Sequence, residues 1–97
     1  MPRIFTIEED FDAAAVAVLK PVFEELAAGD EDVVLDLSRV EFIDSSGVGA
    51  IVFLYKRLRA RSLTLLLRDP KGQPLGLLSH LRMMDLVETK RSAGEAA

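Results

Sequence analysis

The sequence predicts an α/β domain in which a mixed, mostly parallel sheet of about four strands packs with about three helices. The chain has 97 residues, which suits one small domain with a single core. Short apolar segments alternate along it with longer segments whose apolar residues recur at helical spacing. Two of the short segments are apolar on both faces, which is typical of central strands covered by helices.

The first strand and the first helix are expected near the start of the chain. Residues 3–7 (RIFTI) are rich in β-branched and aromatic side chains and predict a short strand. Asp12 is a suitable N-cap for an amphipathic helix over residues 13–28, which Gly29 ends. Pro21 lies inside this helix and is expected to kink or split it, because proline lacks an N–H and crowds the preceding turn.

The middle of the chain predicts two central strands with a helix between them. Residues 33–37 (VVLDL) form the first of these strands, and a connection over residues 38–45 leads to a helix at residues 46–60. Residues 63–67 (LTLLL) form the second strand. A crossover through the helix makes the two strands parallel.

The last third of the chain predicts a loop, a short helix and an edge strand. The helix begins near Pro74, which suits a first helical position, and ends near Arg82. Residues 85–89 predict a short edge strand. We expect residues 1–89 to form a single domain and residues 90–97 to form a flexible C-terminal tail.

The composition excludes several classes of protein and site. Cysteine is absent, which excludes disulfides, thiolate metal sites and cysteine nucleophiles and fits a reduced, cytoplasmic setting. The chain shows no signal peptide, and no segment approaches the roughly 20 apolar residues that span a bilayer. We therefore expect a cytoplasmic protein without direct membrane insertion.

Charge is distributed unevenly along the chain. Residues 1–38 contain ten acidic and two basic residues, a net charge of −8, whereas residues 39–97 contain ten basic and six acidic residues, a net charge of +4. A basic segment can bind nucleic acid, but no aromatic-rich basic patch accompanies this one. Complementary surfaces of one domain explain the asymmetry more simply, so no nucleic-acid partner is expected.

The segment DSSGVG at residues 44–49 lies between an apolar stretch and a predicted helix. Aspartate and serine cap helix N-termini, small residues allow another backbone to approach, and a helix N-terminus attracts anions. Asp44, Ser45 and Ser46 can therefore act only as caps, or Ser46 can accept a phosphoryl group that changes the charge of a docking surface. The sequence offers no general base for Ser46, so no catalytic role is expected.

A helical projection of residues 46–60 separates a buried side from an outward side. With Ile51 at the centre of the buried side and about 100° per residue, the outward side contains Ser46, Gly49, Ala50, Phe53, Lys56 and Arg57. Phe53 is a large apolar side chain next to small residues, which indicates a docking patch. Ser46 is expected to be outward and reachable, whereas Ser45 lies nearer the boundary and is the less favoured phosphorylation site.

Residues 33–49 (VVLDLSRVEFIDSSGVG) resemble the sequence signature of STAS domains, especially those of bacterial anti-sigma factor antagonists. In that family a strand of pattern (V/L)(V/L)LDL leads to (F/Y)(I/M/V)DS(S/T)G(L/V)G and a helix. The strand, the spacing and the motif all agree with the pattern here. The resemblance continues more weakly over residues 3–89 as a whole.

The resemblance implies a regulatory binding module without enzymatic activity, cofactor or metal. In that family the unphosphorylated antagonist binds an anti-sigma factor that is also a serine kinase, and a serine phosphatase reverses the phosphorylation. The phosphorylated residue directly precedes the first glycine of the motif, which is Ser46 here. Together with the outward side of the helix, this predicts partner contacts by Asp44, Ser45, Ser46, Gly47, Gly49, Phe53 and Arg57.

The chain departs from the family pattern in three places. The family has one further strand before the strand matched by residues 3–7, and a glycine in the turn that is EDFD here, at residues 9–12. The closing helix of many members is missing or very short after Thr89. We therefore expect an open edge of the sheet that can pair with a second copy to form a homodimer.

Two other classes of function stay open. The same fold can serve as an accessory subunit of a membrane transporter, such as a phospholipid-type ABC transporter, with the same face docked on the ATPase. A nucleotide-binding sensor is less favoured, because no phosphate-binding loop motif occurs. His80 is the single histidine, lies among leucines and is not expected to bind a metal.

Overall fold

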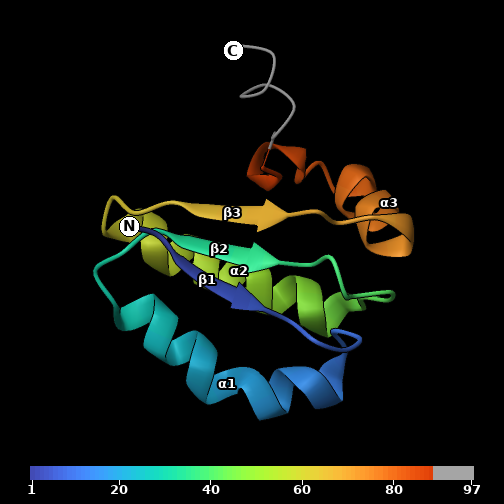
Figure 1. Cartoon of the computed structure of the whole chain (residues 1–97), viewed down its shortest axis with the longest axis horizontal. Coiled ribbons are helices and arrows are strands. Elements are labelled where there is room, and N and C mark those ends of the chain that lie inside the picture. Colours follow the sequence, from blue (N-terminus) through green and yellow to red (C-terminus); the bar gives the residue numbers. More distant parts are fainter. Residues whose placement is uncertain (89–97) are drawn as a thin grey trace.

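All strands of the sheet are parallel and lie in chain order (Figure 1). The computed structural model describes residues 1–88, in which β1 (Arg3–Thr6) pairs with β2 (Val33–Asp36) and β2 pairs with β3 (Leu65–Arg68). The register places Val33 between Arg3 and Leu65. β2 is therefore the central strand, and β1 forms an outer edge.

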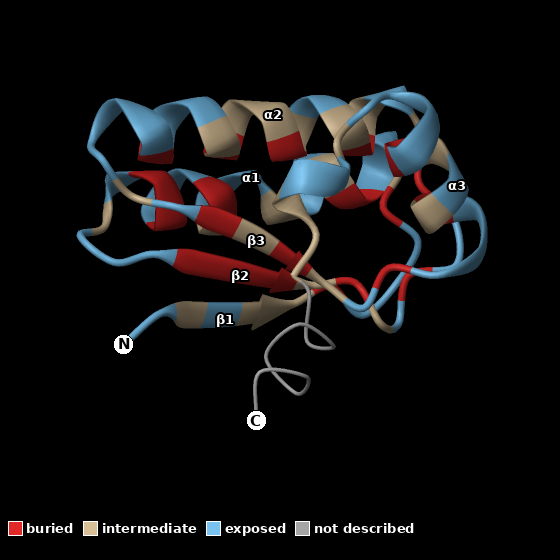
Figure 2. Ribbon diagram, turned by 90° about the horizontal axis from the view of Figure 1, so that it is seen from above, coloured by how far each residue is buried: buried red, intermediate tan, exposed pale blue. Residues whose placement is uncertain are grey.

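Two long helices cover one face of this sheet (Figure 2). α1 (Ala13–Ala28) connects β1 to β2, and α2 (Ser45–Ala60) connects β2 to β3. α3 (Gly72–His80) and a short 3₁₀ helix (Met84–Leu86) follow β3. This arrangement confirms the predicted α/β class. Within residues 1–88, none of the helices combines the length and the apolar character that crossing a bilayer requires.

The sheet has three strands in the described residues, where the sequence predicted about four. The edge strand predicted at residues 85–89 is instead the 3₁₀ helix followed by a single parallel bridge between Leu67 and Val87. In this bridge the Glu88 N–H donates to the Leu67 carbonyl at 2.8 Å. Residues 89–97, which include the expected tail, lie outside the described residues.

The hydrophobic core lies between the sheet and the two long helices (Figure 2). β3 alternates buried and half-buried residues, as expected for a half-covered sheet, whereas Val33, Val34 and Leu35 of the central strand β2 are all buried. The buried core side chains from these elements include Val33, Leu35, Leu65, Leu67, Phe23, Leu26, Ile51, Leu54 and Leu58. The core therefore fixes which side of α2 faces inward.

α1 occupies the predicted residues and continues through Pro21, so the expectation of a split helix is wrong. Pro21 cannot donate to the carbonyl of Ala17, four residues earlier. Both Ala17 and Pro21 are exposed, so water can satisfy that carbonyl. The helix ends at Gly29 as predicted, but Gly29 has φ −73° and does not use the left-handed conformation.

α2 and α3 both end in a left-handed residue that is not glycine. Ser62 follows α2 with φ 61°, and Arg82 follows α3 with φ 61°. In each case the next residue donates back across the turn: Leu63 to the Leu58 carbonyl at 2.8 Å and Met83 to the Leu78 carbonyl at 2.9 Å. These are Schellman motifs, which normally place glycine at the left-handed position.

α1 and α2 lie side by side and run in the same direction. At their N-terminal ends, the Ala13 N–H of α1 donates to the Asp44 carboxylate, which caps α2, at 3.3 Å. At their C-terminal ends, the Arg61 guanidinium donates to the carbonyls of Ala27 and Gly29. The two helices are therefore joined at both ends by charge-assisted hydrogen bonds.

Candidate partner-binding site on helix α2

The Asp44 carboxylate organises the start of α2. One oxygen accepts from the Gly47 N–H at 3.0 Å, which is the N-cap bond, and the other accepts from the Ala13 N–H of α1. Asp12 caps α1 in the same way by accepting from the Ala15 N–H at 3.0 Å. The positive ends of two helix dipoles therefore meet beside Ser45 and Ser46.

Gly47 allows the first turn of α2 to pack against Phe11. A Cβ atom at Gly47 would lie 2.3 Å from the Phe11 carbonyl oxygen and 2.7 Å from Cγ1 of Ile43. Gly47 is buried, so it shapes the site from inside and offers no surface to a partner. This differs from the expectation that Gly47 makes partner contacts, because the sequence does not show the approach of Phe11.

The loop before α2 is held from the other side by α3. The Gln73 side-chain amide donates to the Ile43 carbonyl at 3.0 Å, and its oxygen accepts from the Ile43 N–H at 2.9 Å. Both backbone groups of Ile43 are thus satisfied by a single side chain. The position of Ser45 and Ser46 is consequently set by β2, α1 and α3 together.

Ser45 and Ser46 are the first two residues of α2, and their order of exposure differs from the prediction. Ser45 is exposed, whereas Ser46 is half-buried. The buried residues of α2 are Gly47, Ile51, Leu54 and Leu58, so the inward side is centred slightly away from Ile51. Compared with the prediction, α2 is therefore rotated about its own axis, which turns Ser45 outward and brings Ser46 toward α1.

The outward side of α2 is divided into a ridge and a flank. Gly49 and Lys56 lie on the exposed ridge, and nothing lies within 4 Å of the place that a Cβ of Gly49 would take. The flank beside α1 carries Ser46, Ala50, Phe53 and Arg57, which are spaced by three or four residues. The residues predicted to contact a partner therefore remain on one continuous surface, apart from Gly47.

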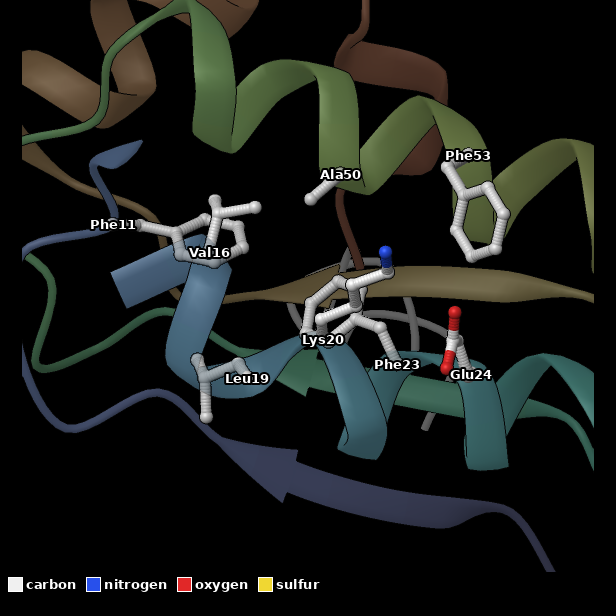
Figure 3. A pocket seen from close by; sticks show the side chains of 8 residues that line it. All are labelled: Phe11, Val16, Leu19, Lys20, Phe23, Glu24, Ala50 and Phe53. Carbon is white, nitrogen blue, oxygen red and sulfur yellow. The ribbon is translucent and has the colours of Figure 1, made fainter. Parts of the chain in front are cut away.

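Phe53 does not point into solvent as predicted, because α1 lies alongside it. Its half-buried ring helps to line a cavity of about 210 Å³ between α1 and α2 (Figure 3). The Arg57 guanidinium carbon lies 4.9 Å from the centroid of the Phe53 ring, which is a cation–π contact. We call this cavity the α1–α2 groove, lined by Phe11, Val16, Leu19, Lys20, Phe23, Glu24, Ala50 and Phe53.

The sequence did not identify the half of the site that α1 supplies. Val16, Lys20 and Glu24 line the groove opposite Ala50 and Phe53. Their spacing of four residues places them on one side of α1, which is a signal that the sequence contains. What the sequence lacks is the relative rotation of the two helices, and only the packing fixes it.

Within residues 1–88, no cluster of three or more histidine, cysteine, aspartate or glutamate side chains is placed to hold a metal ion. His80 is exposed at the end of α3. The exposed Ser45, the half-buried Ser46, the helix N-termini and the apolar groove are the features with which a partner can interact.

The model of the STAS domain family matches residues 2–96 of the chain. A search of curated proteins found no match. Among solved structures, a candidate anti-sigma factor antagonist from Thermotoga maritima is 28% identical with a TM-score of 0.79, over 96% of this chain and 84% of that chain.

Two more distant structures share the fold. The Bacillus cell fate determinant SpoIIAA, an anti-sigma factor antagonist, is 18% identical in its phosphorylated form, with a TM-score of 0.71 over 96% of this chain and 87% of that chain. A sulfate transporter family protein from Wolinella succinogenes is 22% identical, with a TM-score of 0.72 over 89% of this chain and 70% of that chain. Because the family match spans almost the whole sequence, the chain belongs to the STAS domain family.

Proposed function

We propose that this chain is an anti-sigma factor antagonist that binds a serine-kinase anti-sigma factor and is switched off by phosphorylation of Ser46. One observation carries the proposal. Ser46 begins the flank of α2 that continues through Ala50 and Phe53 to Arg57, so a modified Ser46 lies on the same surface as the apolar groove. The 28% identity to a candidate antagonist of the same fold supports the class of function.

In the proposed reaction the kinase partner supplies ATP and catalysis. A bond forms between Ser46 Oγ and the γ-phosphorus, the bond from that phosphorus to the β,γ-bridging oxygen breaks, ADP leaves, and the serine hydroxyl proton passes to the kinase. A serine phosphatase then hydrolyses the phosphoester and restores the hydroxyl. The chain itself contributes an accessible acceptor at a fixed position and no catalytic group.

The charge change explains how phosphorylation can release the partner. A phosphoserine carries a charge of about −1.5 to −2 at neutral pH. Here it lies near the N-termini of α1 and α2, which favour it, and near Asp44 and Asp12, which oppose it. A dianion at the end of the docking flank also repels any acidic group of the partner.

Intact-mass measurement after incubation with purified serine-kinase anti-sigma factors and ATP tests this function. We expect the wild-type chain to gain one phosphate and Ser46→Ala to gain none, while Ser45→Ala still gains one. Equal gain by wild type and Ser46→Ala, or no gain with any kinase, contradicts the switch. Gain by Ser46→Ala but not by Ser45→Ala moves the site to the more exposed Ser45.

The transporter hypothesis uses the same surface with a different partner. An accessory subunit docked on an ABC-type ATPase needs no phosphorylated serine. Co-purification with such an ATPase, unaffected by Ser46→Ala, would replace the proposed function with this one. The fold is shared with a sulfate transporter family protein, and this similarity is one of fold alone.

The open edge of β1 supports a homodimer as a further property of the proposed antagonist. In the described part of the chain, β1 pairs on one side only, with β2, and Ile4 on this strand is 54% exposed. Unpaired strand edges recruit other strands. Light scattering after size exclusion should give twice the chain mass for the wild type and the monomer mass for Ile4→Lys; a monomeric wild type contradicts the dimer.

A further inference from the structure

The α1–α2 groove is a defined apolar recess beside Ser46. Phe11 and Phe23 form its floor, with ring centroids 5.6 Å apart, and Val16, Ala50 and Phe53 form its walls (Figure 3). Its volume of about 210 Å³ exceeds the roughly 150 Å³ of an engineered apolar cavity that accepts benzene. The groove can therefore receive one large apolar side chain.

Charged groups surround the mouth of this recess. Lys20 extends from α1 toward α2 (Figure 3). Arg57 lies over the Phe53 ring. Lys20 and Glu24 are the cation and the anion among the lining residues, and Arg57 adds a second cation next to the lining residue Phe53. An apolar ligand with an acidic neighbour complements this surface better than a neutral or basic one.

The surface next to the groove admits a closely packed helix. Gly49 and Ala50 are small, and the space beside Gly49 is open. A partner backbone can therefore approach α2 closely at Gly49. This geometry favours an element that lies along α2 and inserts a side chain into the groove, as in helix-in-groove recognition.

We infer that the α1–α2 groove receives one leucine- or phenylalanine-sized side chain from an amphipathic helix of the partner, whose neighbouring acidic residue contacts Lys20 and Arg57. This inference rests on the proposed function and adds the chemistry of the partner to it. It also identifies the group of the partner that a phosphate on Ser46 would repel. A dianion on Ser46, one turn from Ala50, opposes the acidic residue of the docked helix at the end of the groove.

Two groove variants test the inference without endangering the fold. Ala50→Leu adds a side chain at the half-buried wall and fills the groove, and Lys20→Glu reverses a charge on an exposed side chain at its mouth. The matched controls are Ala17→Leu on the exposed side of α1 and Lys71→Glu at the start of α3. Circular dichroism and thermal unfolding of each variant confirm that it folds.

The readout is calorimetric affinity for the purified kinase that phosphorylates the wild-type chain. We expect Ala50→Leu and Lys20→Glu to weaken binding about tenfold or more, and both controls to bind as the wild type does. Equal binding by all variants overturns the groove as the docking site and leaves the proposed function intact. A wild-type chain that no kinase binds or phosphorylates overturns both.

Two further measurements separate other occupants of the groove. If Ala50→Leu abolishes self-association in light scattering but leaves kinase affinity unchanged, a second copy fills the groove and the inference is wrong. If it abolishes co-sedimentation with anionic phospholipid vesicles instead, a lipid chain is the occupant and the inference is equally wrong. Loss of kinase affinity alone supports the partner helix.

Discussion

Gly47 packs so closely on Phe11 that a Cβ atom at Gly47 would lie 2.3 Å from the Phe11 carbonyl oxygen. Gly47→Ala must therefore displace α2 from the turn before α1. We expect it to lower the free energy of unfolding by about 2–3 kcal/mol, as overpacking of a rigid contact does. Urea unfolding followed by circular dichroism measures this change.

Gly49 provides the matched control in the same helix. A Cβ atom at Gly49 would have no neighbour within 4 Å, so Gly49→Ala meets open space. Alanine is the better helix former, and we expect a gain of about 0.5–1 kcal/mol in the free energy of unfolding. A loss of similar size in both variants would contradict a specific contact between Gly47 and Phe11.

Asp44 caps its own helix and also accepts from the first N–H of α1, whereas Asp12 caps α1 alone. We expect Asp44→Ala to cost about 2 kcal/mol and Asp12→Ala about 1 kcal/mol in the free energy of unfolding. Amide hydrogen exchange distinguishes the two, because only Asp44→Ala should speed exchange at both Ala13 and Gly47. If only the Gly47 N–H exchanges faster in Asp44→Ala, the hydrogen bond from the Ala13 N–H of α1 to Asp44 does not persist in solution.

Ser62 and Arg82 hold the left-handed positions of two Schellman motifs, each at φ 61°. Glycine adopts this conformation without the steric cost that a side chain incurs. Ser62→Gly and Arg82→Gly should each raise the free energy of unfolding by about 0.5–1 kcal/mol. Ser79→Gly, inside α3, is the control and should destabilise the chain; a uniform effect of glycine at all three positions would argue against the motif.

The Asp36 carboxylate should make stability dependent on pH. The Ser38 N–H donates to it at 2.9 Å, and this bond, with Arg68 nearby, lowers the pKa of Asp36. A lowered folded-state pKa stabilises the fold above the unfolded-state pKa of about 4, and this contribution disappears as the pH falls through the folded-state pKa. We therefore expect part of the fall in the free energy of unfolding at acidic pH to come from the protonation of Asp36.

Asp36→Asn keeps an acceptor for Ser38 but removes the titration. We expect it to be about 1 kcal/mol less stable than the wild type at pH 7, and this difference to shrink as the pH falls through the folded-state pKa of Asp36. Urea unfolding over a series of pH values measures this. A difference in stability that stays constant with pH would mean that Asp36→Asn acts through a change of packing or hydrogen bonding and not through the loss of a titrating carboxylate.

The elements that the sequence predicted well are those whose residues carry their own periodicity. The strand at Val33–Asp36 and the helix from Asp12 onward follow from side-chain pattern and capping chemistry. Pro21 does not split α1, because the effect of a proline inside a helix depends on whether the carbonyl it leaves unpaired, here that of Ala17, can reach water, which is a property of the folded surface. The turns after Ser62 and Arg82 lack the glycine that would have marked them.

The candidate site was predicted in its α2 half and missed in its α1 half. The motif placed Asp44, Ser45 and Ser46 at a helix start, and the structure has them there. The surroundings of Phe53 depend on how α1 packs against α2, as the lining of the groove by residues of both helices shows. Such a relationship joins residues far apart in the chain, and local pattern does not contain it.

The parallel order of the sheet also sets the course of folding. Arg3 pairs with Val33 and Val33 with Leu65, so each strand pair closes a loop that contains a whole helix. In the described residues no hairpin is available as an early local nucleus. Each strand pair must overcome the entropy of closing its loop before it gains its hydrogen bonds and contacts. This cost slows folding and makes it cooperative. On the ribosome, β2 can pair only with β1 until β3 has emerged, and its other edge presents unpaired N–H and C=O groups until then.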